Sequence, residues 1–240
     1  MSPPERPVAH VPRWILLFLA VSLAAQICWK AGMKPGRPQA DELPRPPSPQ
    51  LLHIAAFGEP ATLARLVMLY LQAFDYHGTN ALPFRKLDYQ HLTGWLASIQ
   101  DLDKLSEYPL FVAARVYSDV PDKGRQRMML EFVYRQFLLD PNRRWPWLAH
   151  AALVAKHQLK DLQLARKYAH AVDQLTTATN VPLWAKQMEI FILEDMNEIE
   201  AARIMLGGLL ESGRIADPGE RRFLENRLKE MEQREDAQGR

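Results

Sequence analysis

Cysteine is almost absent from this chain of 240 residues, and a strong charge of either sign is missing too. The single cysteine, Cys28, lies inside an apolar N-terminal run, so the rest of the chain has no disulfide framework and no cysteine-based zinc finger. The chain has 30 Lys and Arg against 28 Asp and Glu, a net charge of +2. Nucleic-acid-binding domains carry a clear excess of basic residues, so we expect no nucleic-acid partner.

Signatures of catalysis and metal binding are also missing. The sequence contains no Gly-x-Ser-x-Gly elbow, no phosphate-binding glycine loop and no His-Glu-x-x-His. His150 and His157 are seven residues apart and share a helix face, but a metal site needs three or four converging ligands. We therefore expect no enzyme activity, no metal and no cofactor. An all-α enzyme with an unrecognised site is the remaining alternative.

Residues 14–30 form the one long apolar run. They read WILLFLAVSLAAQICW from Trp14 to Trp29, and Arg13 and Lys30 close the two ends. Sixteen helical residues reach about 24 Å, which is short for a bilayer. Interfacial tryptophans and snorkelling basic side chains make up the difference. The pattern predicts a transmembrane signal anchor after a short tail at residues 1–13.

A cleaved signal peptide is the alternative for this run, because Ser22-Leu23-Ala24 supplies small residues for cleavage. A buried core helix is disfavoured, since a polar linker follows directly. Lysine and arginine counts favour a cytoplasmic C-terminal domain, whereas a short tail before a signal-like segment favours its export. We expect a single-pass protein of the inner (cytoplasmic) membrane, with its soluble domain on the periplasmic side.

Residues 31–58 are interpreted as a proline-rich linker. The stretch from 31 to 50 contains six prolines and two glycines, with almost no large apolar residues. Such a segment cannot bury enough surface to fold, and its prolines favour extended polyproline II. At ~3.1 Å per residue it reaches roughly 60 Å when fully extended. We expect a semi-rigid spacer between the membrane and the soluble domain.

Prolines recur at a fixed step in the remainder of the chain. Pro109, Pro146, Pro182 and Pro218 are 37, 36 and 36 residues apart. A period of this size is typical of stacked helical hairpins. No segment alternates apolar and polar residues as a half-buried strand does, so the predicted fold class is all-α.

The helical-repeat domain is expected over residues 59–234, with a disordered tail at 235–240. The first three repeating prolines each open a hairpin, and the fourth opens a polar closing helix. Asp217 caps that helix, with Pro218 at its first position and Glu220 in a capping box. The predicted helices cover residues 60–74, 87–102, 110–119, 122–139, 147–158, 161–175, 183–196, 197–210 and 221–234.

Over residues 88–234 the pattern resembles tetratricopeptide repeats. Ala165 and Ala202 lie at matching places in second helices, and Pro146, Pro182 and Pro218 precede successive units. The chain departs from that family in its longer period, 36–37 residues against 34. It also lacks the small residue inside the first helices, and Met128 replaces the alanine of the first unit.

The resemblance implies a groove lined by the first helices of successive units, suited to an extended peptide or a helix. Alternatively, the same residues pack against the neighbouring hairpin. The residues that the resemblance places on the concave face are Trp147, His150, Val154, His157, Trp184, Gln187, Phe191 and Glu194.

The string Asn142-Arg143-Arg144-Trp145-Pro146-Trp147 is a second candidate for recognition, because Arg and Trp are favoured at binding hot spots. The preferred interpretation is structural: the tryptophans wedge between hairpins, and the arginines stay in solvent near the preceding helix end. Together these patterns predict a membrane-anchored helical-repeat scaffold that binds a protein partner, in assembly or regulation of a membrane complex. A soluble exported helical-repeat binding protein is the alternative.

Overall fold

The computed structural model describes residues 12–32, 43–73 and 87–238, and it divides the chain into two compact units. The first unit covers residues 1–38 and the second residues 39–240. The described residues form helices joined by turns, without a strand, which confirms the predicted all-α class.

The first unit contains α1, Arg13–Gly32. This helix has 20 residues, so it is longer than the uncharged run and reaches about 30 Å, close to the thickness of a bilayer's hydrocarbon core. Its large apolar side chains are exposed, with Trp14 at 69% and Trp29 at 73%. The helix is long and apolar enough to cross a membrane, a property that signal sequences share.

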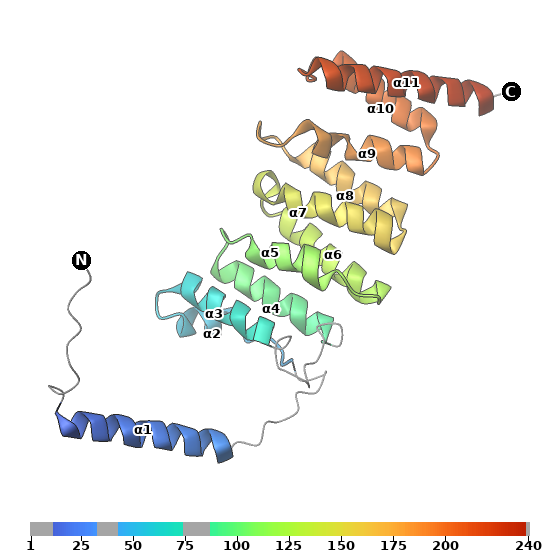
Figure 1. The fold of residues 1–240 in the computed structure, drawn as a ribbon. Coiled ribbons are helices and arrows are strands. Elements are labelled where there is room, and N and C mark those ends of the chain that lie inside the picture. The colour runs from blue at the N-terminus through green and yellow to red at the C-terminus, as the bar shows by residue number, and fades with distance from the viewer. Residues whose placement is uncertain (1–11, 33–42, 74–86, 239–240) are drawn as a thin grey trace. The chain divides into compact units, whose positions relative to one another are not determined.

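The second unit is a series of helices that follow one another in chain order (Figure 1). From α6 onwards each α-helix packs against the next along the chain, and α4 also contacts α6. The elements are α2 (Pro49–Ala55), α3 (Pro60–Ala73), α4 (Tyr89–Leu102), α5 (Tyr108–Val112), the π-helical turn η4 (Ala113–Tyr117), α6 (Lys123–Phe137), α7 (Pro141–Val154), the π-helical turn η5 (Ala155–Leu159), α8 (Leu162–Leu175), α9 (Leu183–Asp195), α10 (Ile199–Glu211) and α11 (Pro218–Gln238).

Aspartates start several of these helices. Asp88, Asp122 and Asp161 accept hydrogen bonds from backbone N–H groups in the first turns of α4, α6 and α8, at 2.8 to 2.9 Å. These bonds satisfy donors that have no partner within the helix. Asp217 caps α11 in the predicted way, through a 2.8 Å bond from the Glu220 N–H. The Glu220 carboxylate bonds Gln187 of α9 at 3.0 Å instead of closing a capping box.

Two apolar clusters form the core of the second unit. The larger cluster runs from Leu43 to Ile192 and includes the fully buried Phe132, Phe137 and Tyr168. The smaller cluster joins α9, α10 and α11 through ten buried residues, among them Leu206, Leu224 and Met231. The core is thus distributed along the series of helices, as in proteins built by stacking hairpins.

The predicted linker is wrong in its second half, since part of it packs on α4. Leu43 is buried, its carbonyl lies 2.7 Å from His91 Nδ1, and the Trp95 indole donates to the Pro44 carbonyl at 2.8 Å. Residues 49–55 then form α2, which buries Leu52. The prolines of 44–49 are compatible with docking because an extended segment leaves its carbonyls available to side-chain donors. Of the expected spacer, residues 33–42 lie outside the described residues.

The repeating prolines mark helix starts at three of four positions. Pro109, Pro182 and Pro218 lie at the beginnings of α5, α9 and α11. Pro146 was expected to open a helix and instead lies inside α7, which begins at Pro141. A proline at the first helical position loses no hydrogen bond, so Pro141 is the better start, and Pro146 removes only one bond from the second turn.

The C-terminal helix is longer than expected. It continues to Gln238, four residues beyond the predicted end and into the segment expected to be a disordered tail. The sequence from 221 to 238 is rich in Glu, Arg, Lys and Gln, which have high helix propensity, so nothing in it ends the helix early.

Candidate functional site

The tryptophans of the predicted groove lie at contacts between alternate helices. The Trp147 ring on α7 meets the Phe111 ring on α5 edge-on, with centroids 5.7 Å apart. The Trp184 ring on α9 meets Trp145 on α7 in the same way at 5.6 Å. Trp184 is still 53% exposed. Both predicted tryptophans therefore lie at junctions between first helices, where the resemblance placed the groove.

The other three predicted residues of the middle unit differ in burial. His150 is half-buried, and burial together with the nearby Arg115 lowers the pKa of its imidazole. Val154 is buried in the larger core cluster. His157 is exposed and lies in the π-helical turn η5. Only two of the three, His150 and His157, are accessible to a partner.

On α9, the remaining predicted residues face α11. Gln187 is buried and donates to Glu220, and Phe191 packs against the smaller core cluster. The Glu194 side chain is 8% exposed and accepts hydrogen bonds from Arg227 at 3.0 Å and Arg234 at 2.7 Å. The hydrogen bond to Glu194, followed by one to Glu230, raises the pKa of the Arg227 guanidinium. Contacts within the chain thus engage this part of the predicted groove.

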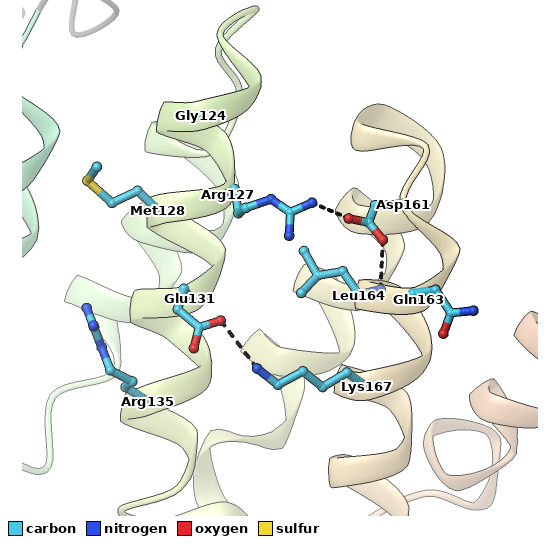
Figure 2. A pocket seen from close by; sticks show the side chains of 9 residues that line it. All are labelled: Gly124, Arg127, Met128, Glu131, Arg135, Asp161, Gln163, Leu164 and Lys167. Carbon is cyan, nitrogen blue, oxygen red and sulfur yellow. Dashed lines mark hydrogen bonds and ion pairs between the residues drawn. The ribbon is translucent and has the colours of Figure 1, made fainter.

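An open hollow lies elsewhere, between the second helices α6 and α8. It has a volume of about 700 Å³, and Figure 2 shows its side chains projecting from the two helices. None of the predicted groove residues lines it. The lining residues are Gly124, Arg127, Met128, Glu131, Arg135, Asp161, Gln163, Leu164 and Lys167.

Two ion pairs bridge the hollow. Arg127 bonds Asp161, and the Lys167 ammonium lies 3.6 Å from Glu131 (Figure 2). The Leu164 backbone N–H, followed by Arg127, lowers the pKa of Asp161. The Tyr168 hydroxyl donates to Glu131 at 3.3 Å. Burial, together with the negative charge of Glu131, raises the pKa of the Tyr168 phenol. Both carboxylates are thus bonded within the chain and act as fixed parts of the wall.

The cations of the hollow outnumber its anions. Arg135 is exposed and makes no hydrogen bond or ion pair within the part of the chain that the structure describes. A second hollow of about 490 Å³ shares Arg127 and Asp161 with the first and adds Lys123 and Lys160. Together the two hollows present five basic and two acidic side chains. An arginine that is exposed and unpaired can accept a carboxylate in a bidentate pair.

The second candidate from the sequence, the Asn142–Trp147 string, has a structural role in part. Arg144 is 4% exposed and donates to the Gln136 carbonyl at 2.7 Å and to the Lys104 carbonyl at 3.2 Å. Burial, together with Arg143, lowers the pKa of its guanidinium. The expectation that both arginines stay in solvent is therefore wrong for Arg144, because backbone carbonyls at the end of α6 and after α4 supply acceptors in the interior.

No group of three or more His, Cys, Asp or Glu side chains within the described ranges is placed to hold a metal ion. Comparison of the chain with protein-family models, curated proteins and solved structures finds no match.

The hollow has a signal in the sequence, namely oppositely charged residues spaced by about one repeat. Glu131 and Lys167 are 36 residues apart, and Arg127 and Asp161 are 34 apart, so each pair joins equivalent helices of adjacent units. Opposite charges at the repeat period on second helices therefore indicate contacts between neighbouring units. The tetratricopeptide pattern places the binding groove on the first helices, so it does not indicate these charged pairs on the second helices.

Proposed function

We propose that this protein is a membrane-anchored, tetratricopeptide-like scaffold that binds a protein partner, in assembly or regulation of a membrane complex. The observation that carries the proposal is the hollow between α6 and α8, where Arg135 is exposed and has no partner among the described residues. The N-terminal helix supports the anchor, because it is long and apolar enough to cross a bilayer.

The chemistry of the hollow favours an acidic segment of the partner. Arg127 and Lys167 are already paired across it, so a partner carboxylate would meet Arg135 first and Lys123 and Lys160 at the adjoining hollow. Charged complementarity of this type sets association rate and specificity more than total affinity. We therefore expect binding that weakens as salt increases.

Site-specific photocrosslinking in intact cells tests this proposal. A photoreactive phenylalanine analogue replaces Gln163, an exposed residue lining the hollow, and the same analogue replaces the exposed Glu200 on α10 as a control. We expect one protein adduct of defined mass from position 163 and none from position 200. Arg135→Glu should reduce that adduct several-fold, whereas Lys229→Glu, the same reversal on the exposed face of α11, should leave it unchanged.

An adduct that is insensitive to Arg135→Glu would reject the hollow as the binding site. In that case the junctions of the first helices become the leading surface, since Trp184 is half exposed there. Trp184→Ala and His150→Ala should then weaken an adduct formed from position 157. If neither variant changes any adduct, the predicted groove is wrong as well.

The soluble exported protein is the second candidate, because a signal sequence has the same length and apolarity as α1. The mass of the protein isolated from cells decides between them: loss of the residues up to Ala24 identifies a cleaved signal peptide. The orientation is tested in the variant Cys28→Ser with Gln233→Cys on α11. We expect labelling of intact cells by a membrane-impermeant thiol reagent, which places the helices on the periplasmic side.

A further inference from the structure

Helix α3 is apolar on nearly all sides, although the described residues cover only one side of it. Ala64, Val67, Met68 and Leu71 form the buried stripe that packs on α4. The remaining sides carry Leu66, Leu69 and Tyr70, with exposures of 58%, 60% and 42%. A helix that is hydrophobic all round normally has protein or lipid on every side.

The preceding helix and turn extend this uncovered surface. Leu51 and Ile54 of α2 are 55% and 71% exposed, and Phe57, in the turn between α2 and α3, is 93% exposed. The backbone of Phe57 is in the left-handed region, with φ of 48°, which a bulky residue rarely adopts. Such backbone strain persists where the surrounding structure enforces it, and here it occurs at a residue whose phenyl ring is almost fully exposed.

These exposed side chains lie at one end of the second unit. Both α2 and α3 pack on α4, so their outer faces point away from the remaining helices (Figure 1). We define the apolar end surface as Leu51, Ile54, Phe57, Leu66, Leu69 and Tyr70. Clusters of large exposed apolar side chains mark sites of contact with protein or membrane.

We propose that the apolar end surface rests in the headgroup region of the bilayer that α1 crosses. The proposal rests on the membrane anchor of the proposed function. The chain itself sets the distance: ten residues, 33–42, join the end of α1 to Leu43, and at most ~3.6 Å per residue gives a reach of about 40 Å. Because Leu43 and Pro44 are bonded to α4, this linker attaches at the end of the second unit that carries α2 and α3.

The polar side chains around the surface suit such a position. Arg45 and Arg65 are exposed near α2 and α3, and long basic side chains reach lipid phosphates while their stems lie along apolar surface. Tyr70 lies 5.7 Å from Trp95, measured between ring centroids, and tyrosine is enriched at the membrane–water interface. Interfacial helices bind by buried apolar area, supplemented by attraction to anionic lipids.

Depth-resolved fluorescence on the full chain tests the proposal. In the Cys28→Ser background, Ala55→Cys on the outer face of α2 receives an environment-sensitive dye, and Glu200→Cys on α10 serves as the matched exposed control. A third variant, Leu17→Cys, reports on α1. The proteins are reconstituted into vesicles of phosphatidylethanolamine and phosphatidylglycerol that contain lipids spin-labelled either near the headgroup or deep in the acyl chain.

We expect the dye at position 55 to emit at shorter wavelength and to be quenched by headgroup-region spin labels several-fold more than the dye at position 200. The double variant Ile54→Glu/Phe57→Glu should abolish that difference, and its unchanged far-UV circular dichroism would show that the helices persist. Added salt should change the quenching little, because the contact is mainly apolar.

The outcomes separate this proposal from the anchor. If the dye at position 17 is quenched by deep labels while position 55 behaves like position 200, the anchor stands and the docking is rejected. Quenching at 55 without quenching at 17 keeps the docking and rejects the anchor. A shift to shorter wavelength that lipid labels do not quench also rejects the docking, and indicates that a second copy of the chain covers the surface.

Discussion

The two ends of the helical series are closed in opposite ways. At the N-terminal end, α2 and α3 turn leucine, isoleucine and phenylalanine outward. At the C-terminal end, α11 buries Leu224 and Met231 and exposes a face rich in arginine, glutamate and lysine. A repeat array needs a polar helix wherever its last hairpin meets water. At the C-terminal end charged side chains thus face solvent, whereas the described N-terminal helices of this unit present large apolar side chains.

The largest difference between the ends should appear on truncating one apolar residue from each. Leu224→Ala removes a side chain that is 1% exposed and should lower the free energy of unfolding by about 2–5 kcal/mol. Phe57→Ala removes a 93% exposed ring and should change it by no more than about 0.5 kcal/mol. Urea unfolding of the full chain in detergent, followed by circular dichroism, measures both. Equal losses would contradict the comparison.

The attachment of α11 should also depend on Glu194. Glu194→Ala removes hydrogen bonds to Arg227 and Arg234 from a mostly buried carboxylate, so we expect a loss of about 1.5–3 kcal/mol. The matched control is Glu225→Ala, which breaks an exposed pair with Arg221 within one helix and should cost only about 0.2–0.5 kcal/mol. If the two variants unfold at the same urea concentration, Glu194 does not hold α11 in place.

Replacing a glycine with alanine should change the free energy of unfolding in opposite directions near the two ends. A Cβ at Gly94 of α4 would meet Pro46 Cγ at 2.8 Å, so Gly94→Ala should destabilise by about 1–3 kcal/mol and loosen residues 43–47. A Cβ at Gly208 of α10 meets nothing within 4 Å, so Gly208→Ala should stabilise by about 0.4–1 kcal/mol. Thermal unfolding measures both changes in stability. If Gly94→Ala leaves the stability unchanged, the proline segment does not pack on α4.

The smallest expected effect is a pH dependence midway between the ends. Burial and Arg115 lower the pKa of His150, so the neutral imidazole is favoured in the folded state. Stability from this residue is complete above its ordinary pKa of about 6.5 and is lost as pH falls towards the lower folded value. His150→Gln should therefore reduce the loss of stability between neutral and mildly acidic pH. The exposed His157→Gln serves as control, and an identical change in both variants would exclude a specific role for His150.

Much of the helical organisation could be predicted because its signals are local. Prolines at Pro182 and Pro218, the Asp217 cap and the apolar periodicity each act within one or two turns of a helix. Pro146 shows the limit of this reasoning: it keeps the repeat period, yet Pro141 begins the helix. Both positions can accept proline in isolation, so the repeat period alone does not select between them.

The candidate sites were less predictable, since each depends on contacts between distant residues. The sequence placed Gln187 and Glu194 on the correct helix, but it could not indicate that α11 donates to Glu194 and accepts from Gln187. The hollow between α6 and α8 needs two helices that are separated in the chain by α7 and the turn η5. Side-chain pairing at that range is set by how hairpins stack, which a single repeat unit does not encode.

By itself, the sequence determined the all-α class, the apolar N-terminal helix and most helix starts, because propensity, capping and apolar periodicity operate over a few residues. Only the tertiary structure decided that the proline segment from Leu43 packs on α4 and that Gln187 of the expected groove bonds α11. It also decided that the described residues leave one face of α3 exposed. These outcomes depend on which surfaces meet when the helices stack, and burial of shared area, rather than any local preference, determines that choice.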